Sequence, residues 1–64
     1  MVTVNNKKAK NTGTAVFELA GLSGDEKPVG EFSGYRIAVN SIFMELDTLD
    51  LYYYTGSGWT KAGG

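Results

Sequence analysis

The stretch from Ser41 to Thr60 constrains the fold of this chain more than any other part of it. Ser41 to Leu46 and Leu51 to Thr55 are rich in apolar and β-forming residues, and Trp59 begins another such run. The runs are separated by two segments of turn-forming residues, Asp47-Thr48-Leu49-Asp50 and Gly56-Ser57-Gly58. Short β-forming runs joined by tight turns predict three consecutive antiparallel strands in this stretch.

The second turn also predicts how its strands pair. Gly56 and Ser57 occupy the tip, and Gly at the first tip position suits a type II′ turn, whose twist matches the flanking strands. The predicted pairs are Tyr54 with Trp59, Tyr53 with Thr60 and Tyr52 with Lys61.

The first turn leaves two pairings open. A four-residue loop from Asp47 to Asp50 pairs Leu46 with Leu51. It needs a left-handed residue near Asp50, a conformation that Asp tolerates better than Leu. A three-residue loop would shift the pairing by one residue and exchange the faces of one strand.

Large apolar side chains occur on both faces of the predicted sheet. On the four-residue register, one face contains Ile42, Met44, Leu46, Leu51 and Tyr53. The other face contains Phe43, Tyr54 and Trp59 in one row, followed by Glu45, Tyr52 and Lys61. A sheet with one face in water should alternate apolar and polar residues. We therefore expect the second face to be covered by the N-terminal third, by another copy of the chain or by a different protein.

The segments before this sheet are less regular. Met1 to Val4 could form a short edge strand, and Asn5 to Asn11 is a polar, turn-like segment that we interpret as a solvated loop. Residues 1–13 are thus a flexible or edge arm. Its lysines, Lys7, Lys8 and Lys10, could alternatively bind phosphate or an acidic partner. No aromatic residue is interleaved with them, and we expect no nucleic-acid partner.

A further strand is predicted at Thr14 to Ala20. Its Ala15, Phe17 and Leu19 would point to one side and Thr14, Val16 and Glu18 to the other, so that it could cover or extend the sheet. Gly21 to Gly34, with Pro28 inside it, is predicted to be a long loop. Tyr35 to Val39 is a brief strand or a turn, and residues 62–64 are a tail.

Size and composition place these elements in one small domain, residues 1–64, of the all-β class: a turn-rich antiparallel meander of three to five strands. A domain of this size buries only about 60% of its unfolded surface. With no Cys and no His, it lacks disulfides, zinc sites and most transition-metal sites. We expect no metal and no cofactor, and oligomerisation or docking as the remaining source of stability.

No motif in the chain predicts catalysis. Without His or Cys, a Ser-His-Asp or Cys-His arrangement cannot be built, and no Ser-Lys pair lies in a known signature. Glu45, Asp47 and Asp50 match neither a calcium loop nor the cleft of a glycosidase, and turn-forming and solvating roles suit the two aspartates. We therefore expect a protein that is not an enzyme.

Charge and hydropathy argue against other partners. The 6 basic and 7 acidic residues nearly cancel, which implies no long-range attraction to nucleic acid or anionic lipid. The sequence contains neither an apolar run long enough to span a membrane nor a signal-peptide core, and we expect no membrane association.

The aromatic group of Tyr52, Tyr53, Tyr54 and Trp59 is the most distinctive constellation of side chains. Three interpretations stay open: cross-strand packing, a protein interface, or stacking on a sugar or a base. We predict that Phe43, Tyr52, Tyr54 and Trp59 either bind a partner or form the second face of the fold.

A resemblance adds to this interpretation. The chain resembles small proteins from the structural-gene regions of tailed bacteriophages and prophages. The resemblance lies in Asp25-Glu26-Lys27-Pro28, Asn40 to Thr48, Leu51 to Tyr54 and Trp59. Members of that group usually have Gly after Asp-Thr, where this chain has Leu49, and Gly before the residue equivalent to Ser41, where it has Asn40.

The resemblance implies a non-enzymatic virion component that is made in the cytoplasm of a bacterial host, such as a head decoration, head-fibre or tail-associated subunit. It also implies capsid or tail proteins as partners, and we expect a homo-oligomer. The alternatives are a small module that binds carbohydrate or a host surface, using the same aromatic residues, and a phage-encoded protein that binds a host protein.

Overall fold

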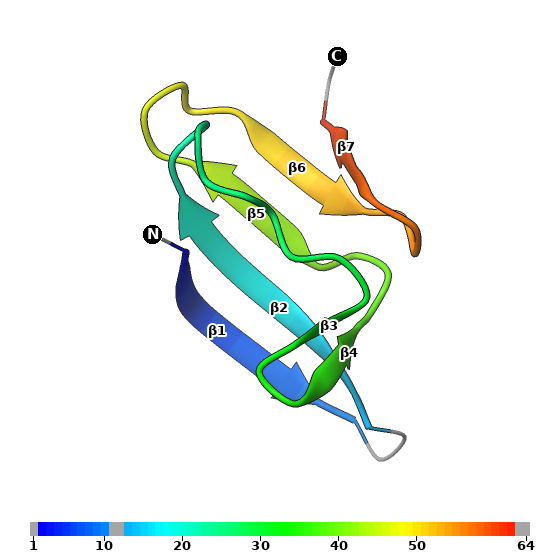
Figure 1. The fold of residues 1–64 in the computed structure, drawn as a ribbon. Helices are drawn as coiled ribbons and strands as arrows, with labels where there is room; N and C mark the ends of the chain where they lie inside the picture. The colour runs from blue at the N-terminus through cyan, green and yellow to red at the C-terminus, as the bar shows by residue number, and fades with distance from the viewer. Residues whose placement is uncertain (1, 11–12, 63–64) are drawn as a thin grey trace.

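The computed structural model describes residues 2–10 and 13–62, and these contain strands but no helix, which confirms the predicted all-β class (Figure 1). The strands are β1 (Thr3–Ala9), β2 (Thr14–Gly21), β3 (Glu31–Phe32), β4 (Tyr35–Ile37), β5 (Ile42–Glu45), β6 (Leu51–Tyr54) and β7 (Trp59–Lys61).

All of these strands belong to one mixed sheet with β2 at its centre. One edge of β2 pairs with β1 in antiparallel fashion, and its other edge pairs in parallel with β4 near Ala15 and with β5 from Glu18 onwards. β5, β6 and β7 form the predicted antiparallel succession, and β3 pairs with β4. The predicted meander of three to five strands is therefore corrected to a mixed sheet of 7 strands. Local alternation could not reveal the two parallel neighbours of β2.

β1 corrects the prediction that Asn5 to Asn11 is a solvated loop. The strand continues to Ala9, its register shifts between Val4 and Asn6, and all of its residues are exposed. A strand without a buried face does not alternate apolar and polar residues, so the polar sequence of β1 gives no sign of a strand. Residues 11 and 12 of the predicted loop, and residues 63 and 64 of the predicted tail, lie outside the described residues.

Of the two hairpin registers, one was predicted correctly. The pairs Tyr54–Trp59, Tyr53–Thr60 and Tyr52–Lys61 are confirmed, and Gly56 has a φ of 103° at the tip.

The first hairpin differs from the prediction. Its loop has the predicted four residues, but they are 46–49, since the Glu45 N–H donates to the Asp50 carbonyl at 2.8 Å. Met44 therefore pairs with Leu51, and the predicted Leu46–Leu51 pairing is wrong by two residues. Leu49, with a φ of 62°, is the left-handed residue of this loop. A shift of two residues leaves every side chain on its predicted face.

The core lies on one side of the sheet, which we call the inner face. Its buried cluster consists of Ala15, Phe17, Leu19, Ile37, Phe43 and Tyr54. Residues 22–30, which we call the crossing loop, run from the end of β2 across this side of the sheet to β3 (Figure 1). The cover for the inner face therefore comes from within the chain, from a segment other than the N-terminal third.

Ser41 closes a gap in the sheet where β4 ends and β5 begins. Its side chain is fully buried, its Oγ accepts a hydrogen bond from the Phe17 N–H at 3.0 Å, and the same hydroxyl donates to the Ala38 carbonyl at 2.8 Å. Between β4 and β5, no backbone carbonyl accepts the hydrogen bond of the Phe17 N–H. The Ser41 Oγ accepts it instead, so this buried backbone donor has a partner.

Candidate docking surface

The four residues predicted to bind a partner all lie on the inner face. Phe43 and Tyr54 are 0% and 2% exposed, and Tyr52 and Trp59 are partly buried against the same cluster. The Trp59 ring centroid lies 6.0 Å from that of Phe43 and 5.0 Å from that of Tyr54. The structure brings the four together, but it encloses Phe43 and Tyr54, so an external partner can reach only Tyr52 and Trp59.

The polar groups of these aromatic residues bind the crossing loop. The Trp59 Nε1–H donates to the Pro28 carbonyl at 2.7 Å, and the Tyr54 hydroxyl accepts from the Gly30 N–H at 2.9 Å. Buried Tyr and Trp side chains usually need such partners. Here the partners belong to the chain itself, and the two bonds fix the second half of the loop over the core.

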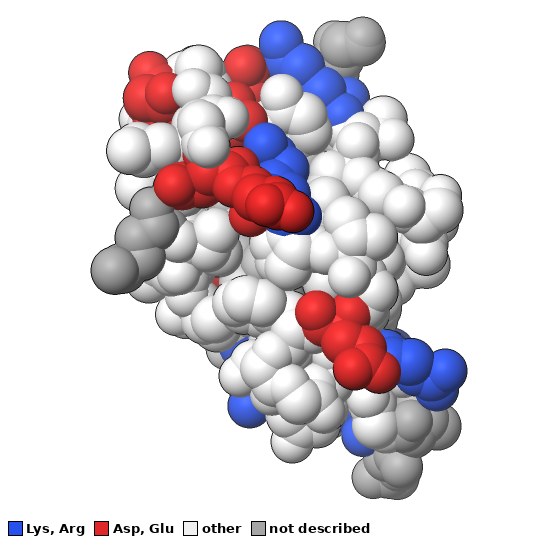
Figure 2. Space-filling view, viewed as in Figure 1, with Lys and Arg blue, Asp and Glu red and all other residues white. Residues whose placement is uncertain are grey.

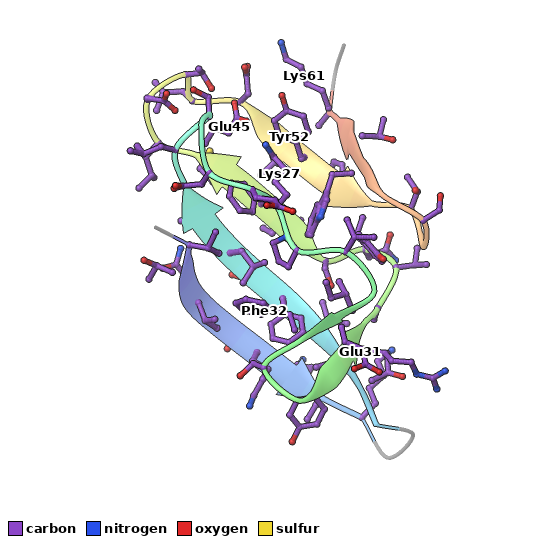
Figure 3. The ribbon with its side chains drawn as sticks, viewed as in Figure 1. Lys27, Glu31, Phe32, Glu45, Tyr52 and Lys61 are labelled. Carbon is purple, nitrogen blue, oxygen red and sulfur yellow. The ribbon has the colours of Figure 1, made fainter. Side chains whose placement is uncertain are left out.

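An ion pair holds the middle of the crossing loop. The Lys27 Nζ lies 2.6 Å from Oε2 of Glu45, whose residue is 4% exposed, and the Thr48 hydroxyl donates to Oε1 at 2.8 Å. The same ammonium group is 4.4 Å from the ring centroid of Tyr52 and 4.9 Å from that of Phe43. Figure 3 shows Lys27 of the loop beside Glu45 and Tyr52 of the sheet. The lysine thus receives both a counter-ion and cation–π contacts.

The other two carboxylates of the predicted cluster have separate partners. Asp47 accepts from the Ser23 N–H at 2.9 Å and from the Ser23 hydroxyl at 2.5 Å, and the hydroxyl bond is the main cause of a lowered Asp47 pKa. Asp50 lies 3.5 Å from the Lys61 ammonium in an exposed pair. Among the described residues, no three carboxylates gather as a metal site would require, and no pocket is found.

The opposite side of the sheet, which we call the outer face, has an apolar surface. Strand register and alternation place six apolar side chains on it: Val16, Ala20, Ile42, Met44, Leu51 and Tyr53. Tyr53 is 44% exposed, and all the others except the buried Ala20 are partly exposed. The crossing loop lies on the inner side (Figure 1), so among the described segments no loop covers the outer face as it does the inner.

This apolar surface continues beyond the strands towards the β5–β6 loop. Leu46 follows the alternation of Ile42 and Met44 just after β5, and it is 57% exposed. Leu49, in the turn itself, is 78% exposed. Contiguous apolar surface of this kind usually marks an interaction site.

Charged residues on the outer face lie to one side of its apolar centre. Glu18 belongs to β2, Lys8 pairs with Val16, and Arg36 pairs with Thr14, so these charges lie on or beside β1 and β2. The rows of β5 and β6 on this face contain no charge. Figure 2, which views the inner side, shows acidic and basic side chains along the loop and at both ends instead.

The sequence pattern did not place Tyr53, an exposed side chain of the outer face, among the candidate binding residues. It identified both faces correctly, but it pointed to the face with more aromatic residues. The signal that could have decided between them was the length of the segment from Gly21 to Gly34, which is sufficient to cross one face of a small sheet.

Comparison with known proteins adds no relative: no family model, no curated protein and no solved structure matches the chain. Within residues 2–10 and 13–62, no helix is long and apolar enough to cross a bilayer.

Proposed function

We propose that this chain is a non-enzymatic assembly protein, a structural or accessory subunit of a bacteriophage virion that acts by docking through its outer face. The observation that carries the proposal is an apolar sheet face that the described part of the chain leaves uncovered, whereas the crossing loop covers the core on the other face.

The energetics favour docking on this face. Completing the burial of a half-exposed side chain the size of Ile, Met or Tyr stabilises a complex by about 1 kcal/mol. On β5 and β6 only Tyr53, which is 44% exposed, comes close to this case. Ile42, Met44 and Leu51 are already mostly buried and each add less, so the four together offset part of the entropy lost on association.

The placement in a virion comes from the sequence resemblance, which includes the β5 and β6 segments. The proposed partners are capsid or tail proteins, and the proposed sites are the head surface, a head fibre or the tail. The residues proposed to contact the partner are now Ile42, Met44, Leu51 and Tyr53, whereas Phe43 and Tyr54 support them from the core.

The test is co-purification with virus particles. Particles from a phage that encodes this chain should contain it after density-gradient purification, detected by mass spectrometry. The variant Tyr53→Lys should be lost from the particle fraction. The matched variant Val39→Lys, at a position that is 56% exposed and lies in the β4–β5 loop, should be retained. Finding the wild-type chain only outside the particles would refute the virion assignment.

A carbohydrate-binding module is the second candidate, and the partial exposure of Tyr52 and Trp59 on one face favours it. Titration with glycans should then produce a saturable change in Trp59 fluorescence, because a sugar that stacks on the ring changes its environment. No change with any glycan, together with recovery in particles, would reject this candidate.

A further inference from the structure

We infer that a second copy of this chain occupies the outer face, in a face-to-face dimer with two-fold symmetry. The inference rests on the proposed docking function: the second copy occupies this surface in solution, and the dimer must dissociate before the same residues bind a virion protein.

The available contact area differs between the surfaces through which two copies could meet. The molecule measures 34 × 22 × 16 Å, so its broad face is a rectangle of roughly 750 Å², close to the about 800 Å² that each partner contributes to a standard interface. An end of the molecule offers only roughly 350 Å², well below that standard. Of these surfaces, only a broad face is large enough for a stable dimer.

Charge complementarity between the ends is present but weak. Asp47 and Glu26 follow strands that end at one end of the sheet, where Lys61 also lies beside Asp50. Lys10 and Arg36 lie at the other end, where Arg36 is paired with Glu31. Such exposed charges attract one another across a head-to-tail contact. Salt screens this attraction over about 8–10 Å, and the small end area adds little to it.

The long β1 edge is protected against pairing. Its register shifts between Val4 and Asn6, and it contains Lys7 and Lys8, which point to opposite faces of the sheet beside the unpaired edge. Bulges and lysines are the devices with which proteins prevent edge-to-edge association. The outer face therefore remains the surface on which copies can meet.

The distribution of side chains on that face suits a two-fold contact. If two copies meet over β5 and β6, Ile42, Met44, Leu51 and Tyr53 of one copy face the same uncharged group of the other. Glu18 and the basic residues then lie towards the rim, where water still solvates them. The contact closes on itself and leaves neither apolar face exposed, and two sheets packed in this way form a sandwich about 10 Å thick.

Sedimentation tests the stoichiometry. The wild-type chain should sediment as a dimer that dissociates on dilution. Tyr53→Lys, which places a charge at the centre of the contact, should raise the dimer dissociation constant about a hundredfold or more. Val39→Lys makes a similar apolar-to-lysine change away from the face, beside Gly56, and should leave the dissociation constant unchanged. Trp59 emission reports whether each variant is folded, because its ring packs on the core.

Because the chain has no Cys, a single introduced thiol locates the contact. The experiment mixes ¹⁵N-labelled chains that have no spin label with Thr60→Cys chains that bear one. The amide signals of Ile42, Met44 and Tyr53 in the ¹⁵N-labelled copy should broaden, because the spin label of the other copy lies close to them. Broadening confined to β1 or to the Asp47 end would overturn the inference, as would a wild-type monomer up to millimolar concentration.

Different results would refute the dimer and the virion function. A monomer in solution that still enters particles through Tyr53 rejects the second copy and keeps the docking function. A dimer that never enters particles keeps the second copy and rejects the virion assignment.

Discussion

Ser41 supplies a hydrogen bond that no backbone group supplies at its position in the sheet. Ser41→Ala leaves the Phe17 N–H buried without its acceptor, and an unsatisfied buried donor costs about 1–3 kcal/mol. We expect the free energy of unfolding, measured by urea denaturation, to fall by about 2 kcal/mol. Ser57→Ala, at an exposed position, should change it by less than about 0.5 kcal/mol. Equal effects of the two substitutions would contradict this role.

Leu49 is strained by its backbone conformation. Its φ of 62° is left-handed, a region that disfavours side chains other than those of Asn and Asp, and its own side chain is 78% exposed. Leu49→Asn should therefore stabilise the monomer by about 0.5–1 kcal/mol in urea denaturation. Leu46→Asn, in the same loop but without a positive φ, serves as the control and should not stabilise.

The carboxyl of Asp47 makes the attachment of the crossing loop sensitive to acid. The Ser23 hydroxyl lowers the Asp47 pKa below its ordinary 3.8, so the folded protein binds this proton less readily than the unfolded chain. The stabilisation is complete above the ordinary pKa and is lost as the pH falls through the lowered one. The ¹³C carboxyl shift of Asp47 should titrate below 3.8, and Ser23→Ala should raise that midpoint.

At the scale of elements, the crossing loop is held by side chains that are distant in sequence. Ser23, Lys27, Pro28 and Gly30 bind residues of β5, β6, β7 and the β5–β6 loop, at separations of 18 to 31 residues. A segment with almost no regular structure is thereby attached to the sheet at four of its residues. Its composition of Gly, Pro and charged residues gives no local sign of this.

The ion pair between Lys27 and Glu45 should be the most costly attachment to break. Lys27→Met leaves a buried carboxylate without its counter-ion, and we expect a loss of about 2–4 kcal/mol in urea denaturation. Adding Glu45→Gln should recover part of that loss, because it removes the buried charge. Lys61→Met, which breaks the exposed pair with Asp50, should cost less than about 0.5 kcal/mol.

The elements that the sequence predicted are those with a local signal. β2 and the succession β5–β6–β7 were identified because their alternation and turn residues are local. β1 was only partly identified because an exposed strand of Asn and Lys does not alternate. The parallel pairs of β2 were missed because the choice of partner strand depends on the whole topology.

The candidate surface was half predicted for a similar reason. Alternation in β5 and β6 separated Ile42 and Met44 from Phe43, which fixed the composition of both faces. Which face the chain covers itself depends on the path of the crossing loop, and that path follows from Trp59 and Tyr54 meeting Pro28 and Gly30. No periodicity in the loop encodes these contacts.

At the scale of the whole molecule, association should appear in thermal stability. If the folded chain dimerises, mass action links its melting temperature to concentration, and a tenfold increase should raise it by about 3–5 °C. Tyr53→Lys should abolish this dependence, and Val39→Lys should preserve it. A wild-type melting temperature that does not change with concentration would contradict the dimer.

The central position of β2 also determines when the chain can fold during its synthesis. β1 and β2 can form a hairpin as soon as they leave the ribosome, but the cluster that buries Phe17 and Leu19 is completed by later segments. Phe32 of β3 packs against Phe17, and Ile37 of β4, Phe43 of β5 and Tyr54 of β6 belong to the same cluster. Contacts between such distant segments form slowly, over about milliseconds to seconds. The nascent chain must therefore keep its first strands soluble until the segments from β3 to β6 have been made, and the exposed lysines of β1 help to do so.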